Sequence, residues 1–236
     1  MIHVDWQQIS LVVFDVDGTL YDQRCLRIKM LRELLAHCLR HPGDLRILRL
    51  LSGYRRCREE LAEEEAESIT ALQYRRPAER MGLEPEDVRR TVEDWMLQRP
   101  LGHLRACRYA KVADFLASLR GRGKTVAVLS DYPAEAKLQA LGLEASLAVS
   151  AVDREVDRLK PHPQGLLRAL ELAKVEPRQA LLIGDRDDRD GECARRAGVA
   201  YLIKGDGSAD GDHRFRDYGD LVRSLHSDPA EDAALQ

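Results

Sequence analysis

Short, largely apolar runs recur along the chain and alternate with segments of helical periodicity. The runs cover residues 11–14, 125–129, 147–149, 181–183 and 200–203. Such runs are typical of strands buried on both faces, as in a parallel sheet. Between them, apolar residues spaced three or four apart predict helices, for example near 112–119 and 166–173. Strands that alternate with helices in this way predict an α/β fold with a doubly wound, mostly parallel sheet.

The stretch from residue 22 to 104 interrupts this alternation. It contains no convincing strand, and its apolar residues form two helical stripes, at Leu31, Leu34, Leu35 and Cys38 and at Val88, Val92, Trp95 and Met96. We therefore expect residues 22–104 to form a helical domain inserted after the first strand. The core would comprise residues 1–21 and 105–225, and the acidic residues 226–236 would form a flexible tail.

Composition excludes several classes of protein. The 236 residues include 37 Lys and Arg against 40 Asp and Glu, a net charge of −3, which is not typical of a general nucleic-acid binder. No apolar run approaches the ~18–20 residues that span a bilayer, so we expect no membrane partner. The N-terminus lacks the features of a signal peptide. The five cysteines are widely spaced without a C-x-x-C motif, which predicts reduced thiols in a cytoplasmic protein.

Two carboxylates follow the first apolar run. In doubly wound sheets, ligands bind beyond the carboxyl ends of the strands, and alternation along the strand places Asp15 and Asp17 on the same side. Like charges this close are unfavourable unless a cation or a proton separates them. We therefore expect a divalent metal at Asp15 and a raised pKa that lets Asp17 donate a proton. Gly18 permits a sharp turn directly after the pair.

The later strand ends carry complementary groups. Ser130 and Asp131 offer a hydroxyl and free backbone N–H groups, which suit anionic oxygens. Lys160 follows a polar loop and could neutralise both a phosphate and a carboxylate. The run at 181–183 is followed by four aspartates in six residues, from Asp185 to Asp190, which is a reasonable oxygen-ligand site for a hard cation.

These four motifs, in this order, resemble those of the haloacid dehalogenase-like (HAD) hydrolase superfamily. The resemblance covers about residues 8–20 and 105–205. The segment from Lys160-Pro161 onwards and the position of the helical insertion resemble the phosphoglycolate-phosphatase-like branch, which has a C1 helical cap. The resemblance implies a Rossmann-like core with an α-helical cap, and a Mg²⁺-dependent phosphatase acting on a small-molecule phosphate ester.

The resemblance also implies residue roles. Asp15 would attack phosphorus and form an aspartyl-phosphate, and Asp17 would protonate the leaving oxygen and then activate water. Mg²⁺ would bind Asp15, the backbone carbonyl of Asp17, and Asp185. The transferring phosphoryl group would be held by Ser130, by the backbone N–H of Asp131 and by Lys160.

Two positions depart from the family pattern. Arg189 stands where many relatives have a second acid, four residues after Asp185, so the supporting acid is assigned to Asp190, with Asp188 as the rival. Asp131 stands where many relatives have asparagine, which adds negative charge near the phosphate. The candidates for contacts that determine specificity lie at the transition from core to cap and are Tyr21, Arg24, Arg27 and Lys29.

Two other functions remain open at this stage. A phosphomutase would use the same aspartyl-phosphate but return the phosphoryl group to a sugar. A non-catalytic module, phosphorylatable like a response-regulator receiver, would also place an aspartate and a lysine at strand ends, although the paired aspartates and the long cap favour an enzyme. The sequence leaves the physiological substrate open, and also whether the protein is a monomer or a homodimer.

Overall fold

A six-stranded parallel sheet forms the centre of the computed structural model, which describes residues 4–205 and 213–227. Its strands are β1 (Leu11–Phe14), β2 (Thr125–Ser130), β3 (Leu147–Ser150), β4 (Ala180–Gly184), β5 (Ala200–Lys204) and β6 (Arg214–Phe215). They lie in the order β3-β2-β1-β4-β5-β6, and every neighbouring pair is parallel. The predicted doubly wound α/β fold is confirmed.

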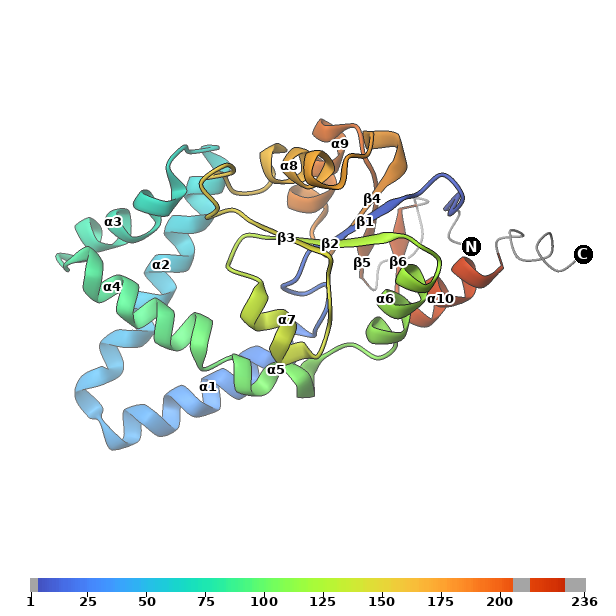
Figure 1. The fold of residues 1–236 in the computed structure, drawn as a ribbon. Helices are drawn as coiled ribbons and strands as arrows, with labels where there is room; N and C mark the ends of the chain where they lie inside the picture. The colour runs from blue at the N-terminus through green and yellow to red at the C-terminus, as the bar shows by residue number, and fades with distance from the viewer. Residues whose placement is uncertain (1–3, 206–212, 228–236) are drawn as a thin grey trace, which may run out of the picture.

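Helices cover both faces of the sheet (Figure 1). The helices α6 (Val112–Gly121), α7 (Glu135–Leu141) and α10 (Tyr218–His226) lie on one face, and α8 (Gln164–Ala173) and α9 (Glu192–Ala197) lie on the other. Alternation along β1 explains the two layers, because Val12 and Phe14 pack with the first group and Leu11 and Val13 with the second. All four side chains are fully buried, which accounts for the uninterrupted apolar run.

The insertion between β1 and β2 is a helical cap, as predicted. It contains α1 (Gln23–Arg40), a 3₁₀ turn (Pro42–Leu45), α2 (Arg46–Glu63), α3 (Ile69–Met81), α4 (Pro85–Val92), a π-helical turn (Glu93–Gln98) and α5 (Leu101–Cys107). Asp22 caps α1 by accepting hydrogen bonds from the backbone N–H groups of Arg24 and Cys25. In Figure 1 the cap extends beyond one end of the sheet.

The cap has its own apolar core, in which Tyr54, Val88, Val92 and Trp95 are buried. The second predicted stripe therefore packs largely as expected. The first stripe is split: Leu34 and Cys38 are buried, whereas Leu31 and Leu35 are 50% and 48% exposed.

The two connections between cap and core lie side by side. The backbone N–H of Asp22 donates to the carbonyl of Cys107 at 2.9 Å, and that of Tyr109 donates to the carbonyl of Leu20 at 3.2 Å. A disulfide joins Cys25 to Cys107 at the same place. The insertion therefore returns to the point where it left the core.

The prediction that all five cysteines are reduced is wrong. Cys25 and Cys107 are 82 residues apart, and only the return of the chain to the cap–core junction brings their sulfurs together. The free cysteines are Cys38, Cys57 and Cys193, and all three are buried. Cysteine usage therefore no longer supports the cytoplasmic assignment, which remains a prediction. Within residues 4–205 and 213–227, none of the helices is long and apolar enough to cross a membrane.

Two predicted domain boundaries fall inside helices. The expected start of the second core segment, residue 105, falls inside α5, which continues to Cys107. Of the expected tail, His226 ends α10, and residues 228–236 lie outside the described residues.

Candidate active site

The carboxyl end of β1 places Asp15 between two neighbouring strand ends. The register pairs Phe14 with Val128 of β2 and with Ile183 of β4, so all three strands end at the same edge. The backbone N–H of Asp15 donates to the carbonyl of Ile183 at 2.8 Å. On its side chain, Thr19 donates to Oδ2 at 2.9 Å and Lys160 donates to Oδ1 at 2.5 Å. The carboxylate is thus buried and held at both oxygens.

Asp17 is held by partners from outside the motif. Nζ of Lys137, on α7, lies 2.6 Å from both carboxylate oxygens, and the hydroxyl of Tyr21 donates to Oδ1. Burial alone would raise the pKa of Asp17, but the charge and hydrogen bonds of Lys137, together with the Tyr21 hydrogen bond, lower it below its ordinary value. The expectation of a raised pKa is therefore wrong: Asp17 is a carboxylate paired with an ammonium group.

Lys160 links the first motif to the last. Besides Asp15, its Nζ donates to Oδ1 of Asp190 at 2.6 Å. The other oxygen of Asp190 accepts hydrogen bonds from the backbone N–H groups of Asp185 and Arg186, both at 3.1 Å. Asp190 is 1% exposed, and its hydrogen bonds to the two backbone N–H groups position the loop after β4. Asp188, the rival acid, is exposed and pairs with Arg186 at 2.8 Å.

An acidic cluster forms at this edge of the sheet. Asp15, Asp185 and Asp190 each place a carboxylate oxygen within 4.8 Å of the others. Burial, and then the charge of Asp190, raises the pKa of Asp185 to about 6, and burial also raises the pKa of Asp15 despite Lys160. One ammonium group does not balance three carboxylates, and an all-oxygen donor set suits a hard divalent cation such as Mg²⁺. The cluster therefore fits the expected metal.

Of the predicted metal ligands, the carboxylates of Asp15 and Asp185 lie together in this cluster. The side chain of Asp17 faces Lys137, and its contribution to the metal site through the backbone carbonyl stays a prediction. The absence of a side chain at Gly18 allows Asp185 to approach the backbone closely. The φ of Gly18 is +101°, and a Cβ on this residue would lie 2.1 Å from Oδ2 of Asp185. Glycine is therefore needed both for the turn and for the close approach.

The loop after β2 is tied to both the core and the cap. Ser130 is fully buried, and its Oγ accepts a hydrogen bond from the backbone N–H of Tyr132 at 3.2 Å. Oδ1 of Asp131 accepts one from the backbone N–H of Lys160 at 3.3 Å. The carbonyl of Asp131 accepts one from the buried Arg58 of α2 at 2.6 Å. The carboxylate of Asp131 thus fixes a neighbouring loop.

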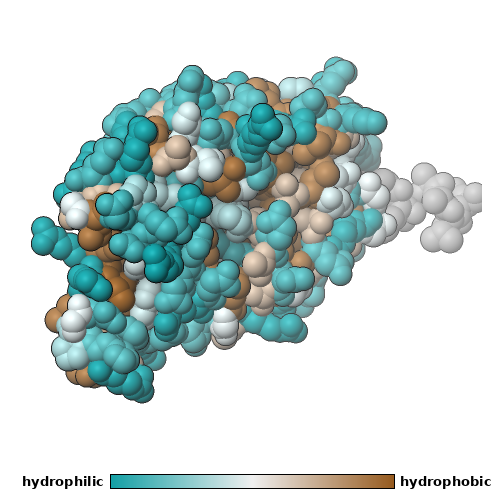
Figure 2. Space-filling view, turned by 60° about the vertical axis from the view of Figure 1, so that its left-hand side comes forward, coloured by the Kyte–Doolittle hydropathy of each residue, from teal (hydrophilic) through white to brown (hydrophobic). Residues whose placement is uncertain are grey.

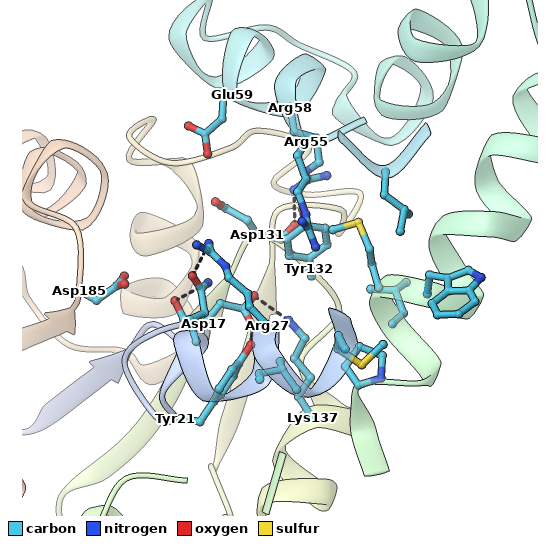
Figure 3. Close-up of a pocket in the computed structure, with 18 of the residues that line it drawn as sticks. Asp17, Tyr21, Arg27, Arg55, Arg58, Glu59, Asp131, Tyr132, Lys137 and Asp185 are labelled. Atoms are coloured by element: carbon cyan, nitrogen blue, oxygen red, sulfur yellow. Dashed lines mark hydrogen bonds and ion pairs between the residues drawn. The ribbon is translucent and has the colours of Figure 1, made fainter. Parts of the chain in front are cut away.

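A cavity of about 630 Å³ lies between the cap and the core. From the core it is lined by charged residues, Asp15, Asp17, Asp131, Lys137, Lys160 and Asp185 among them. Figure 3 shows Arg27 and Tyr21 near Asp17, with Arg55 and Arg58 reaching from α2 towards Asp131 and Tyr132. Of the four specificity candidates, Tyr21 and Arg27 line this cavity, whereas Arg24 and Lys29 do not.

Comparison with known proteins identifies the family. The family model for haloacid dehalogenase-like hydrolases matches residues 9–198. The chain belongs to the haloacid dehalogenase-like hydrolase family. It is 28% identical over 209 residues to pyrophosphatase PpaX of Bacillus pumilus, covering 84% of this chain and 86% of the relative. It is 29% identical over 200 residues to N-acetylmuramic acid 6-phosphate phosphatase of Pseudomonas aeruginosa, covering 81% and 80% of the two chains.

Solved structures share the fold of this HAD hydrolase. A 2-haloacid dehalogenase from Pseudomonas syringae superposes with a TM-score of 0.64 at 23% identity, over 93% of this chain and 99% of the other. A HAD phosphatase from Thermococcus onnurineus also gives 0.64, at 21% identity, over 92% and 98% of the two chains. At this level of identity the similarity concerns the fold, and the chemistry depends on the residues of the site.

Two residues of this HAD hydrolase were not among the predicted site residues. Lys137 and Arg58 both line the cavity, but Lys137 is a single basic residue on α7, and Arg58 follows Arg55 and Arg56 on α2, a cluster that is typical of a solvated helix surface. Only the packing of α7 against the core and of α2 over the site reveals their positions.

Arg189, the departure from the family pattern, connects core and cap. It is buried and donates to the carbonyl of Lys160 at 3.0 Å and to Glu59 of α2 at 2.6 Å. Arg186 also pairs with Glu59, at 3.0 Å. Burial opposes ionisation of Glu59, but hydrogen bonds from the two arginines lower its pKa. The cap is thereby attached to the loop that carries Asp185.

Proposed function

We propose that this HAD hydrolase is a Mg²⁺-dependent phosphatase that hydrolyses a small phosphate monoester through an aspartyl-phosphate on Asp15. The position of the Asp15 carboxylate carries the proposal. It lines the cavity, has an ammonium group on one oxygen, and lies within reach of the Asp185 carboxylate. The curated relatives named as a pyrophosphatase and as a phosphatase support chemistry at phosphorus.

The first step forms a bond between an Asp15 oxygen and phosphorus while the bond from phosphorus to the ester oxygen breaks, and the ester oxygen leaves as an alcohol with a proton from the protonated fraction of Asp17. Thr19 and Lys160 orient the carboxylate before the attack. The ammonium group of Lys160 also offsets the negative charge of the phosphoryl oxygens. Ser130, which was predicted to hold the phosphoryl group, is fully buried and does not line the cavity, and its hydroxyl accepts a hydrogen bond from the backbone N–H of Tyr132.

The second step returns Asp15 to its free form. The carboxylate of Asp17 takes a proton from the water that attacks the aspartyl-phosphate. Lys137 and Tyr21 hold this carboxylate in place. The ammonium group of Lys137 has a third N–H, which can donate to the leaving oxygen of the first step on the same side of the cavity. Mg²⁺, held by Asp15, Asp185 and the backbone carbonyl of Asp17, would offset the repulsion between carboxylates and phosphoryl oxygens.

Substitution of Asp15 tests the proposal. We expect wild-type protein with Mg²⁺ to hydrolyse 4-nitrophenyl phosphate and to show a phosphorylated Asp15 after acid quenching, detected by mass spectrometry. Asp15→Asn should lose both signals. Asp114→Asn is the matched control, because Asp114 is an exposed aspartate on α6 that pairs with Lys111.

Three results would contradict the proposal. Equal turnover by Asp15→Asn would rule out the nucleophile. Phosphorylation of Asp15 without turnover of any ester would identify a phosphorylatable module. An absolute requirement for a sugar bisphosphate would identify a phosphomutase.

A further inference from the structure

The cavity has two walls of opposite character. The core wall carries the charged residues of the site, whereas the cap wall is formed mainly by apolar side chains from α1, α2 and the π-helical turn. Its members include Met30, Leu34, Leu48, Leu51, Trp95 and Met96. Both walls belong to one continuous cavity. A molecule whose phosphate is bound at Asp15 therefore extends onto an apolar surface.

The geometry of the reaction fixes which part of the substrate meets this wall. Phosphoryl transfer places the attacking and leaving oxygens roughly in line, so the leaving group points away from Asp15. Asp15 directly follows β1 of the core, and the cavity that it lines extends from there to the cap, so the leaving group points into the cap half of the cavity. The cap wall thus contacts the organic part of the ester.

The polar residues on the cap side are largely paired with protein groups. Arg58 donates to Gln73 and to the carbonyl of Asp131. Glu59 is paired with arginines of the core. Gln23 bonds Arg27. A sugar or amino-acid leaving group would leave several hydroxyl or charged groups against apolar side chains, which is costly.

The rim of the cavity is apolar as well. Leu31 and Leu48 line it while remaining 50% and 37% exposed. Further exposed leucine and isoleucine side chains lie on the same cap helices, and Figure 2 shows apolar patches among the hydrophilic residues on the cap side. The cavity volume of about 630 Å³ is in the range that holds a drug-sized ligand, well above the need of a two-carbon ester.

We propose that the substrate is an amphiphilic phosphate monoester, with its phosphate at Asp15 and an alkyl or aryl leaving group against Met30, Leu51 and Met96. A longer apolar chain would leave the cavity past Leu31 and Leu48. Arg27 and Arg55, which also line the cavity, supply positive charge that attracts the phosphate. This inference rests on the proposed phosphatase function.

A homologous series of n-alkyl phosphates, from ethyl to hexyl, tests the proposal. The leaving alcohols differ little in acidity, so the series varies apolar area with little change in the chemistry. Burial of one methylene group is worth up to about fourfold in kcat/KM, and we expect a rise of at least tenfold from ethyl to hexyl phosphate. Glycerol phosphate, phosphoglycolate and inorganic pyrophosphate should be poorer substrates than hexyl phosphate.

A matched pair of variants locates the effect. Leu31→Gln changes a residue that lines the cavity, and Leu35→Gln changes one on the same helix that does not, although the two are almost equally exposed. Leu31→Gln should lower kcat/KM for hexyl phosphate about three- to tenfold, more than for ethyl phosphate, by raising KM. Leu35→Gln should leave the series unchanged.

The outcomes separate this inference from the proposed function. A flat alkyl series, a preference for pyrophosphate or phosphoglycolate, or an equal effect of both variants would overturn the amphiphilic substrate while leaving the phosphatase intact. Failure to turn over any ester, together with an unphosphorylated Asp15, would overturn the phosphatase and this inference with it.

Discussion

Reduction of the disulfide between Cys25 and Cys107 should lower the stability of the protein substantially. The bond joins the first turn of α1 to the end of α5 and so closes a loop of 82 residues that contains the whole cap. In the chain-entropy account, a cross-link stabilises a protein by restricting its unfolded chain, and a loop of this length gives about 4.5 kcal/mol.

The magnitude refers to the cross-link alone. The backbone hydrogen bonds from Asp22 to Cys107 and from Tyr109 to Leu20 do not involve the sulfur atoms, so we expect them to persist after reduction. For a chain of this size, 1 kcal/mol corresponds to roughly 2–4 °C in Tm, so the full effect is about 9–18 °C.

Thermal unfolding with and without a phosphine reductant measures the effect, with Cys25→Ser/Cys107→Ser as the control. The double variant should unfold at the same temperature in both conditions and close to the reduced wild type. Thiol titration of the denatured, non-reduced wild type should find the three free cysteines only. A wild-type Tm that does not move after verified reduction would refute the entropic reasoning, and five titratable thiols would refute the bond itself.

Two further substitutions probe the site. Lys137→Met removes the ammonium group from both oxygens of Asp17, so turnover should fall about ten- to hundredfold, in line with the ~1.5–3 kcal/mol of a charged hydrogen bond. Because Lys137 lowers the pKa of Asp17, its loss should move the acid limb of the pH–rate profile to higher pH; an unmoved limb would exclude the pairing. Gly18→Ala should raise the Mg²⁺ concentration needed for activity, because the new Cβ would meet Asp185. Gly82 is the control, because it also has a positive φ but open space around it. Gly82→Ala should therefore lower only the stability, through backbone strain of about 1–3 kcal/mol. Equal Mg²⁺ dependence in both glycine variants would contradict the close approach to Asp185.

The features that the sequence predicted correctly are those set by local patterns. Apolar runs identify buried strands, and the carboxyl ends of adjacent parallel strands meet at one edge, so Asp15 and Asp185 are brought together. The ionisation of Asp17 was predicted wrongly, because it depends on Lys137 from a helix about 120 residues later. The disulfide was missed for the same reason: no local pattern shows that the insertion ends where it begins.

Arg189, which departs from the family pattern, has a structural role that the sequence did not indicate. At a position where the resemblance leads one to expect an acid, a buried guanidinium contacts the carbonyl of Lys160 and the carboxylate of Glu59. Lys160 in turn holds Asp15 and Asp190. The single side chain of Arg189 therefore joins helix α2 of the cap to the backbone of the lysine that holds the nucleophile.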